Sequence, residues 1–346
     1  MFLFLFLQTM FKKANNLKEL ISQPKNIVIT THRGPDGDAM GSSLGLYNLL
    51  INLGHNVNVI TPNDYASFLD WMPGNDTVTE FDGNENKAID ITGKADMIFM
   101  LDFNSLSRLD NFSQTVADSK AYKVLIDHHQ DPDIDIANLI FSDPSSCSTA
   151  QLLYEVIVAM DMTNKINMDI AECLYVGIMT DTGSFKYNST TSKTHSIIAD
   201  LIDKGARNSK IHDLIYDNFS ADRIKLLGYC INDKLLLYPE NNAAIISLTD
   251  EELNKFNFKK GDTEGIVNYA LAIKGIIFAV LIVQRRDIVK LSLRSKGEFK
   301  VNLIANKYFQ GGGHTNASGG ISYLTVNETI KKVENIINIH KEELNN

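Results

Sequence analysis

Short apolar runs that end abruptly in polar residues organise the first half of the chain. Each run has the length of a buried parallel strand and is bounded by polar or turn-forming residues. The runs and the side chains that follow them are 26–31 before His32, 95–101 before Asp102, and 124–126 before Asp127, His128 and His129. Residues that follow such strands emerge at the carboxyl edge of the sheet, where open α/β proteins place their ligands. We therefore expect these side chains to converge.

Helical periodicity alternates with these runs. Apolar positions recur at the helical spacing over residues 40–53, 148–160 and 168–179, and a further strand is expected at 57–61. A strand, a helix and a second short apolar strand in succession are typical of an α/β fold with a doubly wound, mainly parallel sheet.

The second half of the chain has a different pattern and predicts a smaller α/β domain. Apolar runs at 243–248 and 275–284 indicate strands, and residues 288–295 alternate like a half-solvated strand. Helical patterns are expected at 301–308 and 326–344.

These patterns divide the chain into two domains. The divisions are an extension outside the fold at 1–15, a metal-binding catalytic domain at 16–216, a linker at 217–239 and a substrate-binding domain at 240–346. Met10 is an alternative start, and residues 1–9 are expected to lie outside the fold.

Composition and charge argue against several classes of protein. A net charge of −9 disfavours a broad duplex-DNA binder, which needs a basic surface. Cys147, Cys173 and Cys230 have no CxxC spacing and are interpreted as reduced core thiols. The apolar residues 1–7 are shorter than the roughly 20 residues that span a bilayer, and they lack the basic start of a signal peptide. We expect a cytoplasmic protein that does not contact membranes.

Residues with metal-ligand chemistry gather at the predicted strand and helix ends. His32, Asp36 and Asp38 lie in a loop turned by glycine and proline, and Asp181 follows a buried helix at a glycine-containing break. Neutral imidazole and carboxylates suit Mn²⁺, Fe²⁺ or Zn²⁺, and carboxylates suit Mg²⁺. Each aspartate also has a simpler interpretation as a turn residue or a helix cap. The recurrence of the pattern favours a metal-dependent enzyme.

Arg108 and a glycine-rich stretch have the chemistry of phosphate binding. Arg108 follows the strand end at Asp102 closely enough to meet a phosphate, and Arg294 and Ser295 close the strand at 288–295. A glycine-rich stretch contains Gly311, Gly312, Gly313 and His314. Its backbone N–H groups can approach an anion closely and form a nest, although a flexible loop is the alternative.

Taken in order, these motifs resemble the DHH phosphoesterase superfamily. The matching pieces are His32-x3-Asp36-x-Asp38-Ala39-x-Gly41-Ser42, the strand ending at Asp102, Asp127-His128-His129, and Asp181-Thr182-Gly183. Arg294-Ser295 and Gly311-Gly312-Gly313-His314 look like the DHH-associated C-terminal domain of the nanoRNase and pAp-phosphatase branch. The resemblance spans nearly the whole chain except the first 10–15 residues.

The resemblance implies an active site in the cleft between the two domains. It also implies a centre of two metal ions, usually Mn²⁺, with Mg²⁺ or Co²⁺ as substitutes. One ion would be held by His32, Asp36 and Asp102, and the other by Asp38, Asp102, His128 and Asp181, with Asp102 bridging them. Such a pair activates water for in-line attack on phosphorus.

Other residues receive supporting roles from the same resemblance. Asp127 would fix the orientation of a ligand, and His129 and Arg108 would face the scissile phosphate. The second domain would supply Arg294, Ser295, the glycine nest and His314 to hold the remaining phosphate or the terminal nucleotide.

The implied function is hydrolysis of short oligoribonucleotides, of two to five nucleotides, to nucleoside monophosphates, together with removal of the 3′-phosphate from pAp. The alternatives are a phosphodiesterase for linear or cyclic dinucleotides and, from another class, a catalytically inactive nucleotide-binding regulator. A pyrophosphatase should lack the Gly-Gly-Gly-His stretch, and a long-strand exonuclease should be more basic. A homodimer is left open.

Overall fold

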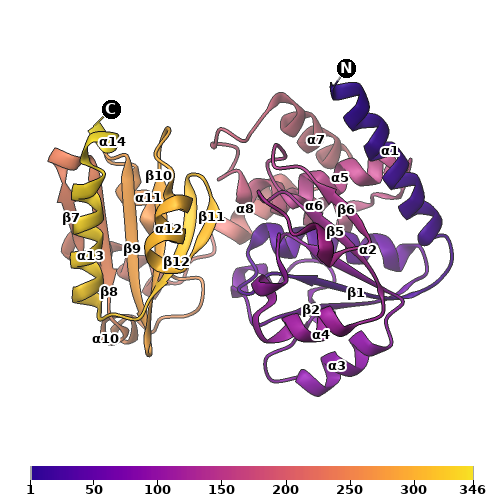
Figure 1. Ribbon diagram of the computed structural model, residues 1–346, viewed down its shortest axis with the longest axis horizontal. Helices are drawn as coiled ribbons and strands as arrows, with labels where there is room; N and C mark the ends of the chain where they lie inside the picture. The colour runs from indigo at the N-terminus through magenta and orange to yellow at the C-terminus, as the bar shows by residue number, and fades with distance from the viewer. Residues whose placement is uncertain (1, 346) are drawn as a thin grey trace. The chain divides into compact units, whose positions relative to one another are not determined.

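The computed structural model describes residues 2–345, with side chains described from Thr9 onward. The chain divides into two compact units, one ending at Asn218 and the other beginning at Phe219 (Figure 1). Each unit is built around its own six-stranded sheet, which confirms the α/β class and the second sheet domain expected from the sequence.

The first unit contains a parallel sheet in the order β3-β2-β1-β4-β5-β6. Its strands are β1 (Asn26–Thr31), β2 (Asn56–Thr61), β3 (Thr79–Glu80), β4 (Met97–Leu101), β5 (Tyr122–Asp127) and β6 (Leu139–Ser142). All five residues of β4 are buried, which explains why its sequence is a continuous apolar run. The strand order reverses between β1 and β4, and doubly wound sheets bind ligands at the carboxyl edge beside such a switch point.

Helices cover both faces of this sheet. The core on one side of the sheet contains residues of α1, α2, α5 and α6, with α7 and α8 packed against α6, and the core on the other side contains residues of α3, η3 and α4. The helices are α1 (Phe2–Leu20), α2 (Gly37–Asn52), α3 (Glu85–Gly93), α4 (Ser113–Asp118), α5 (Thr149–Ala159), α6 (Met168–Asp181), α7 (Ser192–Asp203) and α8 (Asn208–Tyr216). Short 3-10 segments are η1 (Ser67–Leu69), η2 (Asn75–Thr77), η3 (Leu106–Phe112), η4 (Ile134–Ile136) and η5 (Thr163–Lys165).

The N-terminal segment differs from the expected extension at 1–15. Helix α1 runs through most of that range, and Ala14, Leu17 and Ile21 are buried in the core of the first unit. Their spacing of three and four residues gives the helix one apolar face, which the uniformly apolar start of the chain obscures in the sequence. Met1 lies outside the described residues.

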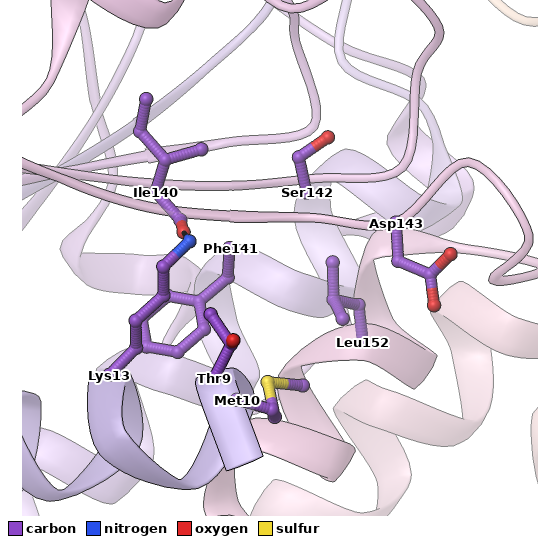
Figure 2. A pocket seen from close by; sticks show the side chains of 8 residues that line it. All are labelled: Thr9, Met10, Lys13, Ile140, Phe141, Ser142, Asp143 and Leu152. Carbon is purple, nitrogen blue, oxygen red and sulfur yellow. Dashed lines mark hydrogen bonds between the residues drawn. The ribbon is translucent and has the colours of Figure 1, made fainter. Parts of the chain in front are cut away.

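Helix α1 is also tied to the edge strand β6. Lys13 Nζ donates a hydrogen bond to the carbonyl oxygen of Ile140 at 2.8 Å, as Figure 2 shows. A small pocket beside this contact has a water-accessible volume of about 40 Å³, and its lining residues include Met10 and Leu152. Over residues 2–345, no helix combines the length and the apolar character that a membrane crossing needs.

The second unit contains a mixed sheet in the order β11-β12-β10-β9-β8-β7, in which only β8 and β9 pair in parallel among the described strands. Its strands are β7 (Leu235–Tyr238), β8 (Ala243–Leu248), β9 (Phe278–Arg285), β10 (Ile288–Ser295), β11 (Gly312–His314) and β12 (Ala317–Ser322). Its helices are α9 (Ala221–Asp233), α10 (Asp250–Lys255), α11 (Ile266–Leu271), α12 (Val301–Phe309), α13 (Val326–Ile339) and α14 (Lys341–Asn345), with η6 at Pro239–Asn241. Helices α9, α10 and α11 pack on one face of the sheet, and α12, α13 and α14 pack on the other.

The segment expected to be a linker, 217–239, instead belongs mostly to the second unit. It forms α9 and β7, and Leu226 and Cys230 of α9 are fully buried against β8 and β9. The many polar positions of α9 suggested an exposed connection. They are compatible with a packed helix, because α9 covers the sheet with one narrow face and leaves its other side in solvent.

Candidate metal centre

The candidate metal ligands come from both sides of the switch point in the first sheet. His32 follows β1, Asp102 follows β4, and His128 follows β5. Asp38 lies in the first turn of α2, and Asp181 is the last residue of α6. The carboxyl edge of one parallel sheet and two helix ends therefore bring together side chains that are distant in the sequence.

Asp36 serves two partners with its two carboxylate oxygens. Its Oδ1 accepts hydrogen bonds from the backbone N–H groups of Asp38 (3.0 Å) and Ala39 (3.1 Å), so Asp36 is the N-cap of α2. Its Oδ2 lies 3.9 Å from Nε2 of His32. The capping interpretation and the metal interpretation of this aspartate are therefore compatible.

His32 and Asp102 complete the first group of candidate ligands. The Nδ1 atom of His32 lies 3.0 Å from the carbonyl oxygen of Arg33, which leaves Nε2 facing the carboxylates. His32 Nε2 lies 3.5 Å from Asp102 Oδ2. The ligand atoms of His32, Asp36 and Asp102 all lie within 4.8 Å of one another, as the donors around one ion must.

A second group shares Asp102 with the first. The Nε2 atom of His128 lies 3.6 Å from Asp102 Oδ1, 3.4 Å from Asp181 Oδ2 and 3.9 Å from Asp38 Oδ2. The two oxygens of Asp102 therefore face different groups, Oδ2 toward His32 and Oδ1 toward His128. This arrangement matches a carboxylate that bridges two cations.

Asp102 adopts an uncommon backbone conformation. Its φ angle is +65°, in the left-handed region, and its side chain is almost completely buried. A non-glycine residue in this region costs on the order of 1 kcal/mol or more and persists where its surroundings fix it. Such strained residues concentrate at functional sites, which supports the functional interpretation of Asp102.

Burial and mutual repulsion shape the protonation of the carboxylates. Burial raises the pKa of Asp102 well above its usual range, and the nearby carboxylates of Asp38 and Asp36 raise it further. Burial also raises the pKa of Asp38, although His128 opposes the shift. Burial would lower the pKa of His128, but the carboxylates of Asp181 and Asp38 outweigh burial and raise it. A divalent cation would relieve this concentration of buried negative charge.

The structure places the residues with predicted supporting roles beside these groups. His129 Nδ1 lies 2.7 Å from Oδ1 of the fully buried Asp127, so Asp127 fixes the orientation of the His129 ring. Arg108 lies in η3, and its carbonyl oxygen accepts a hydrogen bond from the backbone N–H of Arg33 at 2.7 Å. Burial lowers the pKa of His32, and the positive charge of the nearby Arg108 lowers it further. The catalytic roles of these residues remain predictions.

The predicted substrate-binding residues lie together at one end of the second sheet. Arg294 of β10 and His314 of β11 are both in register with Ala317 of β12, so the three residues form one row and share a face. Ser295 is buried, donates to the carbonyl oxygen of Phe299 at 2.5 Å and belongs to the framework of the sheet.

The glycine-rich stretch differs in form from the expected nest. Gly312 to His314 form the edge strand β11, which pairs antiparallel with β12. A Cβ atom at Gly311 would clash with the backbone of Gly319, and one at Gly313 would lie 2.7 Å from the carbonyl oxygen of Ala317. The glycines therefore permit close approach of two strands, and a nest was the wrong description of their backbone.

Two glycines allow α2 and α6 to cross closely enough to bring Asp38 and Asp181 to one site. A Cβ atom at Gly41 would lie 2.6 Å from the carbonyl oxygen of Cys173, and one at Gly177 would lie 2.8 Å from Asp38 Oδ1. Real Cβ atoms do not approach other atoms this closely, so neither position accepts a larger residue without a shift of the helices.

We expect Gly177→Ala to weaken metal binding and to destabilise the protein by about 1–3 kcal/mol through overpacking. The new methyl group would lie 2.5 Å from the Cβ of Ala150 as well as against Asp38. Thermal unfolding with and without Mn²⁺ measures both effects. Gly228→Ala is the matched control, because a Cβ at this exposed helical position meets nothing within 4 Å. Equal Mn²⁺-induced stabilisation of the Gly177→Ala variant and the wild type would show that the crossing does not position Asp38.

One segment that contacts these candidate ligands was not among the residues predicted from the sequence. Residues 146–150 connect β6 to α5, and they contact Asp38, Asp102 and His128. The available signal was the Ser-Cys-Ser-Thr-Ala sequence before an apolar helix, which marks a helix start at the same sheet edge as the other motifs.

Comparison with known proteins agrees with this fold. A model of the DHH family N-terminal domain matches residues 26–178, and a model of the DHHA1 domain matches residues 241–345. The bifunctional oligoribonuclease and PAP phosphatase NrnA of Bacillus subtilis is 30% identical over 307 residues, covering 88% of this chain and 91% of NrnA. The cyclic-di-AMP phosphodiesterase GdpP of the same organism is 28% identical over 94% of this chain, but the match covers 49% of GdpP. The crystal structure of an exopolyphosphatase-related protein from Bacteroides fragilis has a TM-score of 0.92 and 40% identity, covering 97% of this chain and 98% of that one.

The chain therefore belongs to the DHH family of phosphoesterases and carries a DHHA1 domain after the DHH domain. This result confirms the resemblance identified from the sequence motifs. The family is metal-dependent, in agreement with the groups of candidate ligands in the first unit.

Proposed function

We propose that the protein is a two-metal phosphodiesterase that hydrolyses short oligoribonucleotides to nucleoside monophosphates and removes the 3′-phosphate from pAp. The observation that carries the proposal is the similarity to NrnA over both domains, combined with two groups of candidate ligands that share Asp102. A regulator that had lost its activity would be expected to have lost some of these side chains.

The donor set fits two divalent cations, and we propose Mn²⁺. Each group combines one imidazole Nε2 with carboxylate oxygens. Mn²⁺ accepts such a mixture of nitrogen and oxygen donors, whereas Mg²⁺ is typically bound by oxygen atoms alone. Bound cations would supply charge neutralisation and a water of lowered pKa.

The chain's own side chains would orient the substrate around that centre. His129, held by Asp127, and the guanidinium of Arg108 would donate hydrogen bonds to the oxygens of the scissile phosphate. In the second unit, Arg294 and His314 share a sheet face and would bind a second phosphate of the substrate. Recognition of a chain end in this way would favour short substrates over long strands.

The proposal is tested by incubating the full chain with Mn²⁺ and an RNA dinucleotide, a long RNA strand, pAp, pyrophosphate or cyclic di-AMP. We expect rapid release of mononucleotides from the dinucleotide, removal of phosphate from pAp and slow cleavage of the long strand. Preference for cyclic di-AMP would support the second candidate function, which the similarity to GdpP favours. Preference for pyrophosphate or for the long strand would refute both.

A further inference from the structure

We propose that the segment Ser146 to Ala150 is a preformed support for the metal centre, with Thr149 as its principal positioning residue. The segment makes hydrogen bonds to three candidate ligands, Asp38, Asp102 and His128. The inference rests on the metal centre of the proposed function and does not depend on the identity of the substrate.

The side chain of Thr149 contacts the carboxylate that is shared by both groups. Thr149 is fully buried, and its hydroxyl Oγ1 donates to Asp102 Oδ1 at 2.9 Å. This oxygen is the one that faces His128, at 3.6 Å. Because a carboxylate oxygen can accept a hydrogen bond and bind a cation at the same time, the hydroxyl would fix the rotation of Asp102 without occupying the metal position.

The backbone of the same segment holds Asp38. The N–H of Thr149 donates to Asp38 Oδ2 at 2.6 Å, and the N–H of Ala150 donates to Asp38 Oδ1 at 2.9 Å. These are N–H groups in the first turn of α5, which have no partner within the helix. Asp38 belongs to α2, so the start of one helix orients a carboxylate carried by another.

The third contact fixes the His128 ring. His128 Nδ1 lies 3.2 Å from the carbonyl oxygen of Ser146, which as an acceptor selects the ring form protonated on Nδ1. The Nε2 atom then faces the carboxylates of Asp102 and Asp181. Ser146 is itself fixed, since its hydroxyl donates to the carbonyl oxygen of Ser148 at 2.9 Å.

The contact with Asp102 can be tested separately from the other two. It depends on the side chain of Thr149, whereas the contacts with Asp38 and His128 are made by the backbone of the segment. Thr149→Val removes the hydroxyl but keeps the shape of the side chain and the backbone N–H that binds Asp38. Loss of a hydrogen bond that orients a metal ligand lowers metal affinity by about 10–100-fold. We expect this loss of Mn²⁺ affinity in Thr149→Val and a change of less than a few-fold in Thr149→Ser, which retains the donor.

Mn²⁺ binding to the full chain is measured by titration, with the electron paramagnetic resonance signal of free Mn²⁺ and the coupled signal of the bound pair as readouts. Circular dichroism and thermal unfolding without metal establish that each variant is folded. Thr92→Val is the matched control, because Thr92 is also buried but its hydroxyl donates to Ala88 of its own helix. This control should lose stability without a change in Mn²⁺ affinity or in the coupled signal.

The outcomes distinguish this inference from the proposed function. Absence of Mn²⁺ binding to the wild type would refute the metal centre itself. Wild-type affinity and an unchanged coupled signal in Thr149→Val would overturn the positioning role while leaving the centre intact. If Thr149→Val does not fold, Thr149→Cys replaces it, because a thiol is a weak donor of similar size, and the same criterion applies.

Discussion

Asp102→Asn is expected to reduce phosphodiester hydrolysis by at least about 10³-fold, which corresponds to about 4 kcal/mol of lost transition-state stabilisation. Asp102 belongs to both groups of candidate ligands, with Oδ2 at 3.5 Å from Nε2 of His32 and Oδ1 at 3.6 Å from Nε2 of His128. An asparagine has one oxygen, so it can serve one group but cannot bridge two. It also lacks the negative charge that a pair of cations requires.

The variant should remain folded, which separates loss of the centre from loss of structure. Asparagine has nearly the same shape as aspartate and tolerates the left-handed backbone at this position, where φ is +65°. Without metal, the substitution also removes a carboxylate whose charged form is disfavoured, since burial and neighbouring carboxylates raise the pKa of Asp102 well above its usual range. Its loss should therefore not destabilise the metal-free fold.

Turnover of the RNA dinucleotide with saturating Mn²⁺ measures the effect of the substitution. Asp161→Asn is the matched control, because Asp161 is exposed and also has a positive φ angle, +55°. Retention of more than a tenth of wild-type turnover by a folded Asp102→Asn enzyme would rule out a bridging role.

Local sequence was sufficient to predict the parts of the site that depend on single strands. The buried runs of β1, β4 and β5 are apolar on both faces, and their ends carry His32, Asp102 and His128. In a parallel sheet these ends share an edge, so apolar patterning alone indicated that the residues converge. The assignment of each residue to one of two ions required the family resemblance, because spacing in the sequence does not fix distances across a sheet.

Contacts between distant segments could not be predicted in this way. The hydrogen bond from the backbone of Thr149 to Asp38 joins residues 111 positions apart, and nothing in either local sequence indicates the partner. Gly41 and Gly177 are each unremarkable glycines within a helix until the two helices cross. The short edge strand β11 was interpreted as a nest, with a flexible loop as the alternative. Its three residues become a strand only through pairing with β12, which the local sequence does not indicate.

In the absence of metal, the protein is expected to become less stable as the pH rises from about 7.5 to 8.5, a range that lies above the titration of an ordinary histidine. The pKa of His128 is raised in the folded protein, so above the ordinary histidine pKa the folded state keeps a proton that the unfolded state has lost. The raised pKa of Asp102 acts in the same direction as the pH increases from the ordinary range of an aspartate. The free energy of unfolding then falls with increasing pH. His32 and His55 have lowered pKa values, and their opposite contribution ends where an unfolded histidine has lost its proton, which is below this range.

Saturating Mn²⁺ should reverse this trend. Ligands must be deprotonated to bind a cation, so metal affinity increases as the pH rises. A concentration 100 times the dissociation constant stabilises the folded state by about 2.7 kcal/mol. Chemical unfolding at several pH values, with Mn²⁺ or with a chelator, measures both slopes. A metal-free protein that gains stability from pH 7.5 to 8.5 would contradict the raised pKa of His128, because the folded state would then bind fewer protons than the unfolded chain.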